Sequence, residues 1–280
     1  MTNRTVRMTA PTHRTLEGGG FPVRRPAAMG SLMSPFLLLD EMGPVEWGPR
    51  EAIGAPDHPH RGFETVTYLL EGAMQHADSA GNRGDLNPGD VQWMTAGRGV
   101  IHSELPQDDF FETGGLTHGF QIWVNLPAEH KMMDPRYQDI PAQQIPKAVS
   151  EDGQVHAVVI AGEAFGVSAV IDTVIPIQLI HVKMEPNSSF THSIKSDLNV
   201  MTYVFGGSLS IEGKTVEDGQ LGLLTQGSEI TFKTGKDGSE FLLMGGPELN
   251  EPIARYGPFV MNTREEIHQA VIDFQNGTLA

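Results

Sequence analysis

Short segments of alternating or continuous apolar character, separated by turn residues, run along almost the whole chain. β-Branched and aromatic side chains fill 63–70, Val91–Thr95 and 118–125, and glycine-containing turns separate the first two of these segments. Such composition and spacing favour short β-strands. Similar segments recur in the second half, at 155–161, 175–184, 199–205, 222–225, 229–233 and 240–244. The pattern therefore predicts an all-β protein.

The C-terminal residues follow a different period. Thr263 and Glu266 have the spacing of a capping box, in which each residue satisfies a backbone N–H of the other at the start of a helix. Apolar residues then recur at helical spacing, at Ile267, Val271 and Phe274. Asn276 and Gly277 supply a stop signal. We predict one short helix over 263–276, packed on a barrel by its apolar side.

The two halves of the chain resemble each other weakly. Residues 65–72 and 200–207 are both rich in β-branched and aromatic residues and both end in glycine. A turn follows each segment, and Gly89 in the first half has a counterpart at Gly219. A repeat of this length indicates two structurally related domains.

Prolines mark the place where the first half ends. Four of them fall within 127–147, where they interrupt any regular element. Together with the repeat, this segment predicts a first domain at 1–140 and a second at 141–280, the second ending in the helix.

Composition limits the class of protein. The 280 residues include no cysteine, which excludes disulfides and thiolate metal ligands. Neither a bilayer-spanning apolar run nor an apolar signal at the N-terminus is present, so a cytoplasmic protein without membrane contact is expected. The formal net charge of -16 argues against direct nucleic-acid binding, because affinity for phosphates comes from lysine and arginine.

Two motifs, His58-Pro59-His60 and His102-Ser103-Glu104, contain a complete donor set for a divalent transition metal. In a strand, residues i and i+2 point to the same face, so each motif can direct two donors at one ion. A single His-x-His is more often a surface or core feature, whereas two paired motifs between strands favour a shared site. Imidazole suits Fe, Zn, Cu and Ni, and carboxylate suits Fe(II) or Mn(II), so the donors alone do not select the metal.

The second half lacks an equivalent donor set. At the offsets of the repeat, the four donors correspond to Ser193, Lys195, Phe232 and Thr234. His192 lies close to the right place but has no partners in the sequence. We expect the second domain to repeat the fold without the metal site.

The motifs resemble those of a known superfamily. Gly54-x3-His58-x-His60-x3-Glu64-x7-Gly72 is similar to the first cupin motif, and Pro88-Gly89-Asp90 with Gly97-x-Gly99-x2-His102 is similar to the second. Three longer strings, at 58–65, 92–99 and 256–263, resemble the pirin family within that superfamily. The resemblance extends over nearly the whole chain.

The resemblance implies a bicupin, two antiparallel barrels of jelly-roll type, with iron in the N-terminal barrel. The implied ligands are His58, His60, His102 and Glu104. The implied ion is Fe(II), with Mn, Ni, Cu, Co or Zn as possible substitutes. Glu64 would be a near neighbour that holds a ligand or water in place.

Two functions from different classes follow from this resemblance. The first is a quercetin 2,3-dioxygenase-type enzyme, which opens a flavonol ring with O₂ and releases carbon monoxide; Glu104 would be the general base, with Glu64 as the alternative. The second is a redox-responsive regulator that acts through protein partners. A purely structural metal is disfavoured, because structural sites are usually coordinatively closed.

Several further residues are candidates for the lining of a substrate pocket. Gln121 and Trp123 share one face of the strand at 118–125, and His118 has the opposite parity. The candidate aromatic lining, with barrel core as the alternative, comprises Trp93, Phe63 and Trp123. Arg61 and Arg98 lie beside the metal motifs and could meet an anionic substrate or point to solvent.

Overall fold

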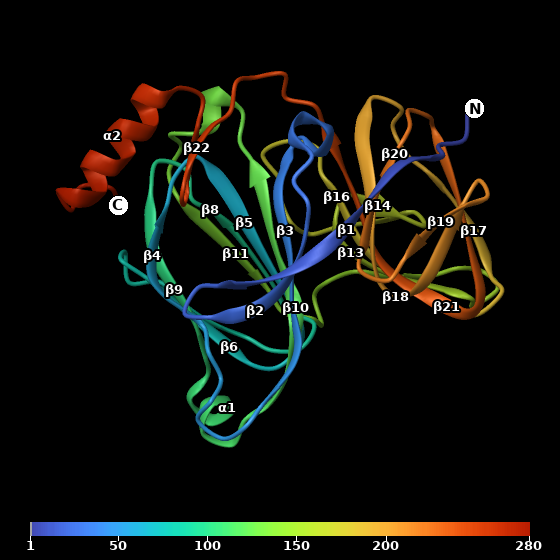
Figure 1. The fold of residues 1–280 in the computed structure, drawn as a ribbon, viewed down its shortest axis with the longest axis horizontal. Helices are drawn as coiled ribbons and strands as arrows, with labels where there is room; N and C mark the ends of the chain where they lie inside the picture. The colour runs from blue at the N-terminus through green and yellow to red at the C-terminus, as the bar shows by residue number, and fades with distance from the viewer. Residues whose placement is uncertain (1) are drawn as a thin grey trace. The chain divides into compact units, whose positions relative to one another are not determined.

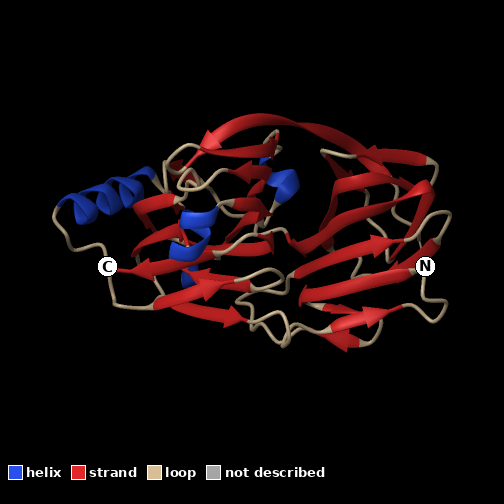
Figure 2. Cartoon of the chain, turned by 90° about the horizontal axis from the view of Figure 1, so that it is seen from below, coloured by secondary structure: helices blue, strands red, loops and turns tan. Residues whose placement is uncertain are grey.

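The computed structural model describes residues 2–280, and β-strands account for most of its regular structure (Figure 2). Two helices, α1 (Asp108–Thr113) and α2 (Arg264–Gln275), and two short 3₁₀ segments, Gly30–Met33 and Ala128–His130, complete the regular elements of these residues. The prediction of an all-β chain with a short C-terminal helix is confirmed. In this part of the chain, no helix combines the length and apolar character that a membrane span requires.

The described residues form two compact units, each assembled from separate segments. The first unit comprises 14–25, 36–142 and 249–280, and the second comprises 2–13, 26–35 and 143–248. The predicted domains at 1–140 and 141–280 differ from these units at both ends of the chain.

Strand pairing accounts for the difference at the N-terminal end. Strand β1 (Val6–Glu17) begins in the second unit, where residues 6–11 pair antiparallel with β20 (Gln220–Leu224). These backbone hydrogen bonds join residues more than 200 positions apart. Local patterning identifies a strand but not its partner, so the sequence pattern did not reveal this pairing.

Helix α2 accounts for the difference at the C-terminal end. Its capping box is formed, because Thr263 Oγ1 accepts from Glu266 N at 3.1 Å and Glu266 Oε2 accepts from Thr263 N at 2.8 Å. The helix lies beside β22 (Ala254–Tyr256) and β23 (Phe259–Met261) of the first unit (Figure 1). The apolar cluster at this contact contains Ile101, Phe259, Ile267, Ala270, Val271 and Leu279. The predicted packing of the helix is thereby confirmed, although Ile267 and Val271 are only partly buried and Phe274 remains 41% exposed.

Besides the two-stranded sheet of β22 and β23, the first unit contains two larger antiparallel sheets. One has the order β11 (Arg136–Ile140), β8 (Val91–Thr95), β5 (Phe63–Glu71), β10 (Gly115–Asn125), β3 (Phe36–Trp47) and β2 (Phe21–Pro26). The other has the order β4 (Ala55–His60), β9 (Val100–Pro106), β6 (Met74–Asp78) and β7 (Arg83–Leu86). The second sheet carries both metal motifs, on its neighbouring strands β4 and β9.

The second unit repeats the strand-rich plan around an apolar interior. Its main sheet contains β20, β18 (Leu198–Ile211), β21 (Glu229–Pro247), β16 (Gln178–Met184), β13 (Val155–Ala161) and β12 (Lys147–Val149). Its smaller strands are β17 (Ser189–Ser193), β19 (Lys214–Glu217), β14 (Glu163–Ala164) and β15 (Val167–Ser168). Twenty buried apolar residues form its core, among them Phe232 at the position that corresponds to His102. The repeat therefore keeps the architecture, and of the four donor positions only that of His102 is taken by a core residue, since Ser193 and Lys195 are exposed and Thr234 is half-buried.

Candidate metal centre

Three histidines converge between β4 and β9. His58 and His60 lie on β4, and His102 lies opposite His58 in the register with β9. One ligand atom from each of the three lies within 4.8 Å of the others. The ring centroids of His58 are 4.7 Å from His60 and 4.5 Å from His102. The i, i+2 spacing on β4 and the pairing of β4 with β9 thus place three imidazoles around one point.

The hydrogen bonds of two of these rings identify the nitrogen that can bind a metal. Nδ1 of His58 lies 2.8 Å from the carbonyl oxygen of Pro56, and Nδ1 of His60 lies 3.4 Å from that of Pro258. Because a carbonyl oxygen only accepts, the proton in each neutral ring is on Nδ1. The Nε2 lone pair of each ring is therefore available as a ligand, in the tautomer that metal-binding histidines use.

His102 provides a test of whether the site suits a metal. The residue is fully buried, and neither ring nitrogen has a hydrogen-bond partner among residues 2–280. A buried polar atom without a partner is costly, on the order of 1–3 kcal/mol. A metal ion that accepted one nitrogen lone pair would remove part of that cost, so the arrangement fits a metal site.

Burial keeps two of the rings neutral. It lowers the pKa of His60 well below its usual value, and the nearby His102 and His58 lower it further. Burial also lowers the pKa of His102 to about 4, although the Glu104 carboxylate acts in the opposite direction. Neutral imidazole is the form that donates a lone pair, so these rings are ready to bind a metal at neutral pH.

Glu104 lies near this cluster on the same face of β9 as His102, but its carboxylate is not one of the three converging groups. The Thr67 hydroxyl lies 2.8 Å from Oε1 of Glu104 and 2.9 Å from Oε1 of Gln121. A carboxylate accepts only, so the hydroxyl donates to Glu104. Thr67 thereby orients the Glu104 carboxylate, which lines a cavity that opens beside the three histidines.

Glu64 faces the other way. Residues of β5 alternate between two faces, so Glu64 and Thr67 point to opposite sides of the sheet. Oε1 of Glu64 accepts a hydrogen bond from the Thr95 hydroxyl at 2.7 Å, and Glu64 is fully buried. Trp93 shares this face, since it stands opposite Val66 in the register, and belongs to the buried core. Neither Glu64 nor Trp93 lines the cavity beside the histidines.

The cavity has a volume of about 530 Å³ and opens beside the histidine cluster. The lining includes His58, His60 and Glu104, apolar side chains from β2 and β3, and the predicted pair Gln121 and Trp123. The other charged lining residues are Glu17, Arg25, Asp40, Asp57 and Arg255. The Trp123 ring stands 5.4 Å from that of His60 and 4.4 Å from that of Phe63. The Trp123 ring thus forms an aromatic wall beside the candidate ligands, whereas Phe63 is fully buried and does not line the cavity.

The two arginines considered in the sequence do not reach this cavity. Nη1 of Arg61 is 2.6 Å from Asp273, which ties the segment between β4 and β5 to helix α2, and Arg98 pairs with Asp134. The arginines that do line the cavity are Arg25 and Arg255, which sequence reasoning missed. A signal was available for Arg255, because it directly precedes the family-like string at 256–263.

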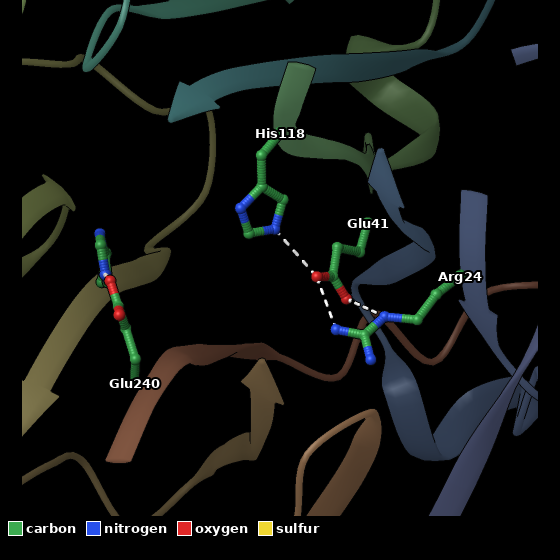
Figure 3. A network of polar contacts seen from close by, with 5 residues as sticks. Arg24, Glu41, His118 and Glu240 are labelled. Atoms are coloured by element: carbon green, nitrogen blue, oxygen red, sulfur yellow. Dashed lines mark hydrogen bonds and ion pairs between the residues drawn. The ribbon is translucent and has the colours of Figure 1, made fainter. Parts of the chain in front are cut away.

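His118 belongs to a separate network, as its parity predicted. Its Nε2 lies 2.9 Å from Oε1 of Glu41, and Arg24 donates to both oxygens of that carboxylate at 2.7 Å (Figure 3). Glu41 is fully buried, so the bidentate arginine compensates its charge. This network is part of the fold of the first unit and does not line the cavity.

Gly62 lies between β4 and β5, where the backbone conformation and its surroundings require a glycine. Its φ is +89°, and a Cβ at this position would overlap the carbonyl oxygen of Val260. We expect Gly62→Ala to lower the free energy of unfolding by at least about 2 kcal/mol, through left-handed strain and the clash. Gly81→Ala is the matched control, since Gly81 has φ +90° with no atom near its Cβ position. Urea unfolding of both variants would measure how much the clash adds to the loss of stability. An equal decrease in the free energy of unfolding in the two variants would contradict the clash.

The metal-free protein is expected to lose stability as the pH falls from 7 to 5. Burial depresses the pKa of His60, of His102 (to about 4) and of His192 (to about 4), so the unfolded state binds protons first, near pH 6.5. His102 and His192 each contribute on the order of 2 kcal/mol over this window, and His60 acts in the same direction. Asp40, whose pKa burial raises, acts in the opposite direction. Urea unfolding at both pH values checks this, and constant stability would contradict it.

Comparison with known proteins supports this description of the fold. A family model described as Pirin matches residues 20–124, and one described as Pirin C-terminal cupin domain matches residues 179–280. Human Pirin is 40% identical over 283 residues, which cover 98% of this chain and 93% of that protein. A Vibrio cholerae protein with a provisional quercetin 2,3-dioxygenase name is 37% identical, over 98% of this chain and 97% of its own.

Solved structures show the same architecture. A crystal structure of quercetin 2,3-dioxygenase from Acinetobacter baumannii matches with a TM-score of 0.95 and 36% identity, covering 100% of this chain and 99% of that one. A bacterial pirin from Escherichia coli, solved in complex with nickel(II), matches with a TM-score of 0.62 at 22% identity, over 86% of this chain and 98% of that one. The second likeness concerns the fold alone. The predicted bicupin architecture is confirmed.

Proposed function

Because the chain belongs to the pirin family, we propose that it is a metal-dependent dioxygenase of the quercetin 2,3-dioxygenase type. The proposed metal is Fe(II), held by His58, His60, His102 and Glu104, with Mn, Ni, Cu, Co or Zn as substitutes in vitro. The proposed substrates are a flavonol-like aromatic molecule and O₂. In the reaction, one O₂ is consumed, the central ring of the flavonol opens, and carbon monoxide is released.

The observation that carries this proposal is the cavity beside the histidine cluster. Its volume of about 530 Å³ falls within the range of small-molecule sites. It combines apolar side chains and the Trp123 ring with a small number of polar groups, which is the usual lining of a site for a flat aromatic ligand. A metal needed only for structure would have no use for such an opening.

The donor set supports a metal that takes part in chemistry. Three imidazoles and one carboxylate around a six-coordinate ion leave positions for a substrate. A bound metal would supply Lewis acidity, which makes an enolic hydroxyl of the substrate more acidic. The absence of thiolate ligands, in a chain without cysteine, is compatible with Fe(II) or Mn(II).

Glu104 is the residue of this chain that we assign to proton transfer. Its carboxylate lines the cavity and is oriented by Thr67. A positioned carboxylate can accept the enolic proton of the substrate as the ring is bound. Coordination would make the same carboxylate a weaker base, so its two assigned roles compete. Glu64 is a poor alternative, because it lies on the opposite face of β5 and is held by Thr95.

Oxygen uptake tests the proposal. The protein would be loaded with Fe(II) without air, mixed with quercetin, and exposed to O₂ in an oxygen electrode beside zinc-loaded and metal-free samples. We expect uptake that requires iron and depends on quercetin. Tight iron binding without uptake would contradict the enzymatic proposal and would favour the alternative, a redox-responsive regulator with a protein partner.

A further inference from the structure

One guanidinium in the cavity is not engaged in a hydrogen bond. Arg255 projects from the short strand β22, and its guanidinium carbon lies 4.7 Å from the centre of the Trp123 ring. Among residues 2–280, no hydrogen bond or ion pair joins this guanidinium to another group. A guanidinium on the face of an indole is held by cation–π attraction, and its N–H edge remains free to donate.

The other arginine of the cavity is fully engaged. Nε and Nη2 of Arg25 lie 2.6 and 2.5 Å from the two oxygens of Asp40, and Nη2 also lies 2.6 Å from Glu17. Asp40 is buried, so this bidentate pair compensates its charge. Asp40 and Glu17 act on Arg255 only through space. The two arginines therefore differ: Arg25 completes the wall of the cavity, and Arg255 retains its donors for a ligand.

Trp123 connects Arg255 to the metal centre. Its ring stands 5.4 Å from that of His60, at an interplanar angle of 74°. A flat ligand held at the histidine cluster and lying along the aromatic wall would extend towards Arg255. The planar N–H fork of an arginine matches the two oxygens of a carboxylate, and such charge-assisted hydrogen bonds are stronger than neutral ones.

We propose that Arg255 determines ligand specificity by binding an anionic oxygen group at the end of an aromatic ligand remote from the metal. The site would then prefer planar aromatic enols that carry a carboxylate or phenolate over neutral enols of the same shape. This inference rests on the proposed function, because it assumes that the enol end of the ligand lies at the metal.

Two ligands that differ only in charge at the remote end test the proposal. They are 3-hydroxyflavone and 3-hydroxyflavone-4′-carboxylate, which share the metal-binding enol and ketone. Binding to the zinc-loaded protein without O₂ would be followed by tryptophan fluorescence. We expect the wild type to bind the carboxylate at least tenfold more tightly. Arg255→Gln should remove that preference and change the affinity for the neutral ligand by less than about twofold.

Controls separate a specific role from a general one. Arg50→Gln removes an exposed arginine that pairs with Glu112 outside the cavity, and it should keep the full preference. Arg255→Lys retains the charge without the planar fork and should restore only part of it. Three results would overturn the inference. Arg255→Gln could prefer the carboxylate as strongly as the wild type does, or it could lose affinity for both ligands equally. The wild type could also bind neither ligand.

The two proposals fail in different ways. The preference is measured without O₂, so it can persist in a protein that shows no oxygen uptake, and then only the enzymatic proposal fails. If the protein takes up O₂ with quercetin in an iron-dependent way but does not distinguish the two ligands, only the proposed role of Arg255 is contradicted.

Discussion

His102→Ala is expected to strip the protein of its metal. His102 is the only imidazole that β9 contributes to the cluster, and its removal leaves two adjacent donors on β4 with Glu104. Loss of a residue that merely supports a ligand typically costs 10- to 100-fold in metal affinity, so loss of the ligand itself should cost more than about 100-fold. After dialysis against a weak chelator, the wild type should retain about one metal ion per chain, and His102→Ala should retain almost none.

Two other histidines provide controls for this variant. His192→Ala removes a histidine that is buried in the second unit, and His130→Ala removes an exposed one beside Glu129. Both should retain the metal. The rise in thermal stability that metal addition gives the wild type should vanish only in His102→Ala, because binding to the folded state adds to stability. A full complement of metal in His102→Ala would contradict the assigned site.

Glu104→Gln is expected to slow flavonol ring opening by about 10²- to 10⁴-fold, the usual contribution of a general base. The amide has the same shape, and its oxygen can still accept from Thr67, so the cavity should keep its form. The rate would be measured as quercetin consumption under O₂ at equal iron content, since the substitution also removes a proposed ligand.

The buried carboxylate on the opposite face of β5 is the matched control. Glu64→Gln keeps the hydrogen bond from Thr95, and we expect its effect on the rate to stay within a few-fold once stability is allowed for. A slow Glu64→Gln enzyme beside an active Glu104→Gln enzyme would reverse the assignment of the base.

Local periodicity predicted which of the candidate side chains share a face of their strand. Because His58 and His60 are two residues apart, they lie on one face of β4. The same rule puts His102 and Glu104 on one face of β9. The rule also separated His118 from Gln121 and Trp123. Applied to β5, it would have removed Glu64 from the candidate bases, because Glu64 and Thr67 have opposite parity.

The sequence pattern could not predict which segments far apart in the chain contact each other. Nothing in residues 6–11 indicates that they pair with β20, and nothing in helix α2 indicates that it packs on the first unit. For the same reason Arg255 was missed: it reaches the cavity only because the segment 249–280 returns to the unit that contains Trp123. Proximity along the chain instead suggested Arg61 and Arg98, which the fold engages elsewhere.

Carbon monoxide release tests the central proposal most directly. Flavonols also oxidise without enzymes, so oxygen uptake alone is less specific than the gas that ring opening expels. The iron-loaded protein should release one carbon monoxide for each quercetin consumed, and Glu104→Gln at equal iron content should release almost none in the same time. Quercetin consumption without carbon monoxide, or equal release from both proteins, would contradict a dioxygenase built on this centre.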